Sequence, residues 1–197
     1  MDERDLDPDP LRQFQAWFTE ARDAGVEVPE AMALATATPE GRPSARMVLL
    51  KGADERGFAF HTNDESRKGD ELAANPQAAL LFHWRPLGRQ VRVEGRVERM
   101  SAEESEAYFR TRPHASRIAA WASPQSRPLA DRAELERLYE EASTRFPGEE
   151  VPLPPYWGGF RLTPDAYEFW EHAENRLHDR VRYEREGSGW ATERLAP

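Results

Sequence analysis

Residues 89–100, RQVRVEGRVERM, alternate apolar and polar side chains along one continuous run. Val91, Val93 and Val97 share one parity. The polar residues Gln90, Arg92, Glu94 and Arg96 take the other. Successive side chains of a strand point to opposite faces, so this run predicts a strand with one buried face and one polar face.

The rest of the chain contains more strand-like than helix-like segments. Strands are expected at residues 31–38, 44–51, 57–62, 77–84, 157–164, 166–171, 180–186 and 189–195, the last four as a second group of short strands. Helices are expected at residues 8–24, 65–76, 101–112, 114–123 and 129–146. The turns are short and no strand-helix-strand rhythm recurs, so a doubly wound parallel sheet is not expected. We expect a mainly antiparallel β (α+β) fold, a barrel with flanking helices.

The length of 197 residues fits one domain with a core of its own. We expect an N-terminal helix region at residues 1–25 and barrel strands at residues 26–100. A helical region follows at residues 101–147, and C-terminal strands occupy residues 156–197.

Composition excludes several classes of function. A formal net charge of −9 argues against a nucleic-acid surface, and zero cysteines exclude disulfides, thiolate catalysis and Cys-ligated metals. No apolar run has the length of a membrane span, and the N-terminus is acidic where a signal peptide would be basic, so we expect a cytoplasmic protein. The common nucleotide, zinc and nucleophile motifs GxGxxG, GxxxxGK[ST], HExxH and GxSxG are absent.

Two segments each contain one of the chain's two lysines. Arg46 and Lys51 stand at the ends of RMVLLK, and their odd separation predicts that they point to opposite faces of a strand. Arg67 and Lys68 follow a strand end and open a helix, where backbone N–H groups and cations form an anion site. Charged strand ends and a solvated helix face are the alternative interpretations.

Two later segments also concentrate polar groups. Tyr108, Arg112 and Ser116 end one helix and begin another, and together they could bind a phosphate, although ordinary helix capping would use the same residues. Arg176, His178 and Arg180 share parity after Trp170, so in an extended segment they would line one face. Metal binding is the weaker interpretation there, since the arginines repel a cation.

Together the four segments provide many cations for phosphate and aromatic rings for a flat ligand. They predict a site for a phosphorylated heteroaromatic molecule. No Ser-His-Asp or Cys-His arrangement suggests a protein nucleophile, so a cofactor would have to supply the chemistry.

Seven stretches, in order along nearly the whole chain, resemble the pyridoxine/pyridoxamine 5′-phosphate oxidases. They are RMVLLK, FHTNDESRK, RQVRVEG, YFRTRP with Ser116, SPQS, VPLPPYWGGFR and EFW…RLHDR…Y. The resemblance implies an FMN-binding split β-barrel with flanking helices. It also implies a homodimer that binds FMN in clefts at the subunit interface.

The resemblance also implies roles for individual residues. FMN would be bound by Arg46, Met47, Val48, Leu49, Leu50, Lys51, His61, Thr62, Arg67, Lys68, Gln90, Gln125, Ser126, Trp170 and Arg180, partly from the partner subunit. Arg67 and Lys68 would face its phosphate. The substrate phosphate would be held by Lys51, Tyr108, Arg112 and Ser116. Arg176, Leu177 and His178 would hold the pyridine ring over the flavin, with Arg176 and His178 as the catalytic pair.

The implied reaction is oxidation of pyridoxamine or pyridoxine 5′-phosphate by O2 to pyridoxal 5′-phosphate, with release of hydrogen peroxide. A hydride leaves the substrate C4′ carbon for the flavin, and the amine substrate then loses ammonia. Three alternatives remain open: a related flavin oxidase of phenazine biosynthesis, a non-catalytic flavin or pyridoxal phosphate binding protein, and a split-barrel reductase that uses deazaflavin.

The chain departs from the family pattern in two places. The family often has a further N-terminal segment, basic and tyrosine-bearing, that covers bound substrate, and this chain is expected to lack it. The family usually has Gln-Gly after the tryptophan, where this chain has Glu171 and His172. A carboxylate near the flavin would repel its reduced, anionic form, and replacement of Gly would stiffen the loop.

Overall fold

The computed structural model describes Met1 and residues 3–197, apart from the side chain of Glu3. Its α-helices are α1 (Pro10–Asp23), α2 (Arg67–Ala74), α3 (Ala102–Thr111), α4 (His114–Ala122) and α5 (Arg132–Arg145). Its strands are β1 (Ala31–Ala37), β2 (Pro43–Leu49), β3 (Gly52–Asp54), β4 (Gly57–Asn63), β5 (Gln77–Trp84), β6 (Arg89–Arg99), β7 (Trp157–Glu171), β8 (Asp179–Glu186) and β9 (Gly189–Arg194). Three 3-10 turns complete them: η1 (Glu3–Asp5), η2 (Arg85–Leu87) and η3 (Glu174–Arg176).

The helix ends follow from local chemistry. The Asp9 side chain accepts a hydrogen bond from the N–H of Leu11 and caps α1, which stops before Gly25 with its left-handed φ of 74°. Ser66 caps α2 in the same way, accepting from the N–H of Gly69. The expected helices are confirmed to within a few residues. Strand β3 was not expected, because its residues were interpreted as part of a turn.

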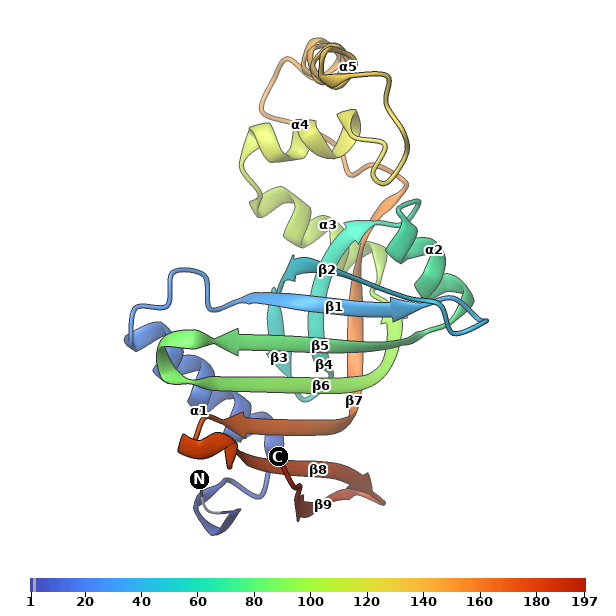
Figure 1. The fold of residues 1–197 in the computed structure, drawn as a ribbon. Coiled ribbons are helices and arrows are strands. Elements are labelled where there is room, and N and C mark those ends of the chain that lie inside the picture. Colours follow the sequence, from blue (N-terminus) through green and yellow to red (C-terminus); the bar gives the residue numbers. More distant parts are fainter. Residues whose placement is uncertain (2) are drawn as a thin grey trace.

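The strands form one sheet in the order β2-β1-β5-β6-β7-β4-β3, with β8 paired to β7 and β9 to β8. All pairings are antiparallel. The sheet curls until β2 contacts β4, which makes a half-barrel (Figure 1). The expected antiparallel class is therefore confirmed.

Strand β7 corrects one prediction. Residues 157–164 and 166–171 were expected as two short strands, but they form a single strand that pairs with β6 along most of its length. The break was expected at Pro164, which cannot donate a ladder hydrogen bond. The register shifts between Glu94 and Gly95, so that Asp165 becomes the extra residue of a bulge and Pro164 stands opposite Gly95.

Helix α1 closes one face of the sheet and builds the main core. Phe14 packs edge-on against Phe58, with ring centroids 4.8 Å apart, and Trp17 packs edge-on against Phe169 at 5.2 Å. The inward side chains of β6, including Val91 and Val93, are fully buried in the same core. The alternation of residues 89–100 thus reflects α1 on one face and a polar surface on the other.

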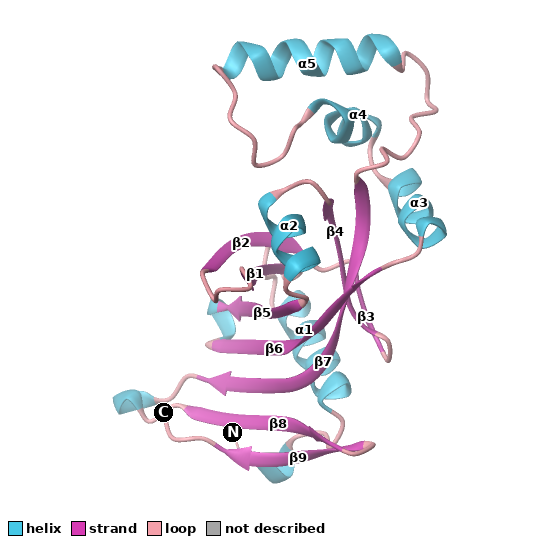
Figure 2. Cartoon of the chain, turned by 90° about the vertical axis from the view of Figure 1, so that its right-hand side faces the viewer, coloured by secondary structure: helices cyan, strands magenta, loops and turns pink. Residues whose placement is uncertain are grey.

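The helical region forms a second core at one end of the molecule, where Figures 1 and 2 both place α4 and α5. Phe109, Ile118 and Val151 are buried there around Trp157, the first residue of β7. This cluster brings α3 and α4 to the end of the half-barrel where β4 ends and α2 begins. None of the helices in the described part of the chain is long and apolar enough to cross a membrane.

Candidate active site

A cavity of about 550 Å³ lies where the barrel meets the helical region. It is lined by Met47, Val48, Leu49, Lys51, His61, Thr62, Lys68, Tyr108, Thr111, Arg112, Pro113, Ser116, Gln125 and Trp157. Eleven of these were predicted as site residues from the sequence; Thr111, Pro113 and Trp157 were not. The first three predicted segments therefore come together, from β2, β4, α2, α3, α4 and the loop after α4.

The charge of the cavity contrasts with that of the chain. Its lining contains the cations Lys51, Lys68 and Arg112 and no carboxylate, although the chain has a net charge of −9. Lys51 is exposed, but Lys68 and Arg112 are half-buried, and half-buried cations are costly unless something neutralises them. Nη1 of Arg112 is buried without a hydrogen-bond partner among the described residues. Such a cavity favours an anion with several oxygen atoms.

Lys68 is the cation on the helix side of the cavity. Its Nζ donates to Ser66 Oγ at 2.9 Å and to Gln125 Oε1 at 3.2 Å, both neutral partners. Burial, with the nearby charge of Arg46, lowers the pKa of Lys68 to about 8. Thr62 Oγ1 also donates to Gln125, over 3.4 Å. Gln125 thereby joins the strand β4 and helix α2 parts of the site.

Tyr108, His61 and Trp157 form a stack on the other side. The His61 ring lies 4.1 Å from Tyr108 and 5.2 Å from Trp157, between centroids, with small interplanar angles. Burial and the charges of Arg112 and Lys51 lower the pKa of His61 to about 4, so the imidazole is neutral at pH 7. The Arg112 guanidinium lies 4.8 Å from the Trp157 ring, and burial lowers its pKa.

The predicted flavin contacts Arg46 and Arg67 lie beside the cavity rather than in its lining. Both are held by Glu71, a buried carboxylate of α2: Arg67 Nε lies 2.8 Å from its Oε1 and Arg46 Nη2 lies 3.3 Å from its Oε2. Arg46 contacts Glu71 and Lys51 lines the cavity, but Lys51 lies two residues beyond the end of β2, so the strand-parity prediction does not extend to it. Of the other predicted contacts near this region, Leu50 is buried in the main core and Ser126 adopts a left-handed φ of 67°.

The remaining predicted residues form a second group on β6, β7, β8 and the turn before β8. Gln90, Trp170 and Arg180 are register partners across these strands, so their side chains share one face of the sheet. The ring of His178 lies 4.6 Å from that of Trp170. Arg180 donates from Nε to the buried carboxylate of Glu168 at 2.8 Å, and Arg92 contacts the same carboxylate at 2.6 Å.

The turn before β8 corrects another prediction. Residues 176–180 were considered as an extended row, but Asn175 and Arg176 adopt left-handed φ values of 55° and 62° within η3. Arg176 and Leu177 consequently project from a tight turn and are exposed. His178 is tied to this turn, because its Nδ1 accepts a hydrogen bond of 3.2 Å from the N–H of Ala173.

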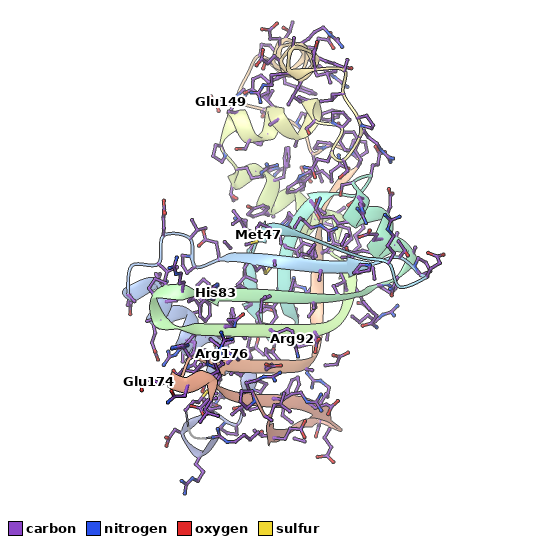
Figure 3. All side chains as sticks on the ribbon, in the orientation of Figure 1. Met47, His83, Arg92, Glu149, Glu174 and Arg176 are labelled. Carbon is purple, nitrogen blue, oxygen red and sulfur yellow. The ribbon has the colours of Figure 1, made fainter. Side chains whose placement is uncertain are left out.

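The cavity residues and the second group do not form one continuous site within a single chain. No residue of the second group lines the cavity, and Figure 3 shows Arg176 and Met47 in separate parts of the molecule. The sheet face opposite α1 connects them, since Met47, Ala33, Leu81 and Arg92 are successive register partners on β2, β1, β5 and β6. Met47 is 65% exposed and Leu81 38% exposed. This face is apolar near the cavity and charged near the second group.

The departures at Glu171 and His172 have local partners. Glu171 pairs with Arg89 Nε at 2.8 Å, which offsets the carboxylate that was expected to repel a reduced flavin. The N–H of His172 donates to the carbonyl of Gly88 at 2.8 Å, and its ring lies 5.2 Å from that of His178. The loop is thereby fastened to the turn between β5 and β6.

Sequence reasoning did not assign Trp157 or Glu71 to the site. Trp157 stands before Gly158 and Gly159, and a Cβ at Gly159 would lie 2.9 Å from His61 Nε2, so the glycine pair lets β7 approach this ring stack. That WGG run was the available signal. Glu71 gave the weaker signal of a carboxylate four residues after an arginine on a helix.

The fold and the cavity define an antiparallel split-barrel protein that binds a flat, phosphorylated ligand. Residues 18–146 match the family model described as pyridoxamine 5′-phosphate oxidase. Residues 157–197 match the model described as the pyridoxine 5′-phosphate oxidase C-terminal dimerisation region. The chain belongs to the pyridoxamine 5′-phosphate oxidase family, and the second match supports a homodimer.

Relatives of similar length cover nearly the whole chain. A protein from Rubrobacter xylanophilus named pyridoxine/pyridoxamine 5′-phosphate oxidase is 61% identical over 191 residues, which are 97% of this chain and 88% of the relative. One of the same name from Cupriavidus taiwanensis is 58% identical, covering 100% of this chain and 93% of the relative. The crystal structure of PhzG from Burkholderia lata, in complex with tetrahydrophenazine-1-carboxylic acid, is 36% identical with a TM-score of 0.92, covering 98% of this chain and 95% of that one.

Proposed function

We propose that this chain is an FMN-dependent oxidase that converts pyridoxamine 5′-phosphate and pyridoxine 5′-phosphate to pyridoxal 5′-phosphate. Molecular oxygen is the final oxidant and is released as hydrogen peroxide. The observation that carries the proposal is the cavity of three cations without a carboxylate in an acidic chain. Its aromatic stack suits a flat ring, and its orphaned Arg112 nitrogen suits a phosphate oxygen.

The cofactor FMN fits the helix side of the cavity. Lys68 there has only neutral partners, and Arg67 adds a second cation at the first turn of α2. The N-terminus of a helix also presents unpaired N–H groups to a phosphate. When bound, FMN supplies the redox chemistry by accepting the substrate's hydride and passing electrons to oxygen.

The substrate fits the other side. Lys51, Arg112, Tyr108 and Ser116 line one wall and can hold the substrate phosphate through charge-assisted and hydroxyl hydrogen bonds. His61 is neutral and half-buried beside Tyr108, so we assign it to packing the ring stack and not to proton transfer. By holding both phosphates, these residues would bring the substrate and the flavin together, and this proximity would be the protein's main contribution to the rate.

We also propose that the site is shared between two subunits, with FMN at their interface. The residues Gln90, Trp170 and Arg180 and the catalytic pair Arg176 and His178 would then reach the cavity from the partner. Two features support this arrangement. The second group lies within the dimerisation region, except for Gln90, which pairs with that region in the sheet. Exposed apolar side chains occur at both places, Met47 and Leu49 at the cavity and Leu177 in the second group. The long strand β7 joins both sets of strands, so we treat residues 1–197 as one domain.

The principal alternative is an oxidase of the phenazine type, and the fold alone does not discriminate between them, since the PhzG structure superposes with a TM-score of 0.92. Sequence identity favours the pyridoxine/pyridoxamine 5′-phosphate oxidases, at 61% against 36% for PhzG. Substrate turnover decides the question directly.

The test is an absorbance spectrum of the purified protein, followed by oxygen uptake with each substrate. We expect a bound flavin spectrum, and oxygen uptake that yields equal amounts of pyridoxal 5′-phosphate and hydrogen peroxide. Bound FMN without aldehyde or peroxide would instead indicate a non-catalytic binding protein. A colourless protein would favour a deazaflavin enzyme.

A further inference from the structure

Glu71 is one of the few charged side chains in the interior, 5% exposed on the face of α2 that packs against β1 and β2. Its Oε2 accepts hydrogen bonds from Thr36 of β1 and, at 2.6 Å, from Ser44 of β2. Arg46 Nη2 lies 3.3 Å from the same oxygen. Arg67 Nε donates to the other oxygen, Oε1, at 2.8 Å. One carboxylate therefore fastens the first turn of α2 to two strands.

The group is held as a carboxylate. Burial opposes its ionisation, but hydrogen bonds from Ser44, Thr36 and Arg67, with the charge of Arg67, outweigh that effect and lower the pKa to about 2. Glu71 is therefore ionised throughout the pH range in which the protein would work.

The two arginines are held differently by this carboxylate. Arg46 uses both terminal nitrogens on its surroundings: Nη1 contacts Leu34 O at 3.1 Å and Thr36 Oγ1 at 2.6 Å, and Nη2 contacts Ser44 and Glu71. Arg67 is held by Nε alone, and its two Nη groups make no hydrogen bond within the described part of the chain. A guanidinium held in this way presents the donor pair that binds two oxygens of a phosphate.

Lys68 stands next to Arg67 in the chain and lines the cavity. The charge of Arg46 contributes to lowering its pKa, which places all three cations in one neighbourhood. The negative charge of Glu71 beside these cations reduces their mutual repulsion before any phosphate arrives. Glu71 thus has both a geometric and an electrostatic route to the proposed phosphate site without touching the ligand.

We propose that Glu71 is the positioning residue of the flavin phosphate site, which orients Arg67 through its Nε and keeps the cation cluster assembled. This inference rests on the proposed function in one respect, namely that the cations of α2 bind the phosphate of FMN. The competing explanation is a purely structural ion pair that fastens α2 to the sheet. The two explanations differ in whether the loss is specific to a phosphorylated flavin.

The test compares two flavins, FMN and riboflavin, which lacks the phosphate. Apoprotein is titrated with each, and quenching of flavin fluorescence gives the dissociation constants. For Glu71→Gln we expect the Kd of FMN to rise about tenfold, as for loss of one charge-assisted hydrogen bond, and the Kd of riboflavin to change less than about twofold. In an Arg67→Met background the same substitution should have a smaller further effect, because the guanidinium that Glu71 orients is gone and only its electrostatic effect on Arg46 and Lys68 remains.

A matched control is available on α5. Arg132 Nε donates to Glu136 Oε1 at 2.9 Å with the same four-residue spacing, but this pair is exposed and outside the cavity. Glu136→Gln should leave the ratio of the two dissociation constants unchanged. Glu71→Asp keeps the charge but withdraws the oxygen from Arg67, and should weaken FMN selectively.

Equal weakening of both flavins by Glu71→Gln would overturn the proposal, as would an undiminished effect in the Arg67→Met background. A Glu71→Gln protein that no longer folds would also overturn it, because the carboxylate would then be structural first. If the wild type oxidises pyridoxamine 5′-phosphate but Glu71→Gln leaves the ratio of the FMN and riboflavin dissociation constants unchanged, this inference alone is refuted. A wild type that fails to oxidise it refutes the proposed activity instead.

Discussion

Replacement of Lys68 by methionine tests the phosphate site with little change of volume. The apolar stem remains, and only the ammonium is lost. In the wild type Nζ is held by Ser66 and Gln125, and no carboxylate of the described residues forms an ion pair with it. A hydrogen bond between a charged donor and a phosphate contributes about 1.5–3 kcal/mol, so Lys68→Met should raise the Kd of FMN roughly 10- to 100-fold.

The pH dependence gives a second signature. Burial lowers the pKa of Lys68 to about 8, and a bound phosphate dianion would raise it again. Binding therefore favours the protonated lysine. FMN affinity should be constant between about pH 7, where its phosphate is a dianion, and about pH 8, and fall by up to about tenfold per pH unit above that, until the raised pKa of the complex is reached. In Lys68→Met this alkaline fall should disappear.

The assay is titration of apoprotein with FMN from pH 6 to pH 10, with Lys51→Met as the matched control. Lys51 is expected on the substrate side, so its loss should raise the KM for pyridoxamine 5′-phosphate while the FMN Kd changes less than about threefold. Equal effects of the two substitutions on FMN affinity would refute the division of phosphates between the lysines. An alkaline fall that survives in Lys68→Met would refute the role of its ionisation.

Two further predictions concern the second group. Arg176→Ala should lower kcat by at least about tenfold with the flavin still bound, since an orienting residue acts after cofactor binding; a colourless apoprotein would contradict that placement. Glu168→Ala leaves Arg92 and Arg180 without their shared carboxylate. The substitution should lower the free energy of unfolding, measured in urea, by about 3 kcal/mol. This is the low end for a broken buried ion pair, because both guanidiniums keep some contact with water. A loss below about 1 kcal/mol would contradict the prediction.

The strands and helices were largely predictable because the chain follows simple periods. Val91 and Val93 alternate with polar residues because α1 covers one face of β6 only. The continuous β7 was not predictable in the same way. A proline usually ends a strand. Pro164 is accommodated within β7 because Gly95 of the neighbouring strand stands opposite it, where a Cβ would lie 2.1 Å from Thr163 O. The alternation of side chains within one segment does not reveal a bulge, because a bulge depends on how two strands pair.

The candidate site divides along similar lines. Lys51 and Lys68 were noticeable as the chain's two lysines, and Arg112 as one of three polar groups that could bind a phosphate; the fold brings all three cations to one cavity. The turn at Asn175 and Arg176 was not foreseen, because Asn adopts a left-handed backbone more readily than most residues but Arg does not, and here two such residues follow each other. The placement of Trp170 and Arg180 in an active site rests on resemblance, since nothing in the periodicity of one chain encodes the surface of a second.

Complementation between two impaired variants tests the shared site most directly. Lys51→Met would disable the cavity side, and Arg176→Ala the side provided by the partner. In a mixed dimer of the two, one site contains both substitutions and the other contains neither. Co-expression should therefore restore about a quarter of the wild-type oxygen uptake with pyridoxamine 5′-phosphate, when half of the dimers are mixed and each has one intact site. Activity no greater than the mean of the separate variants would contradict a site built from two subunits.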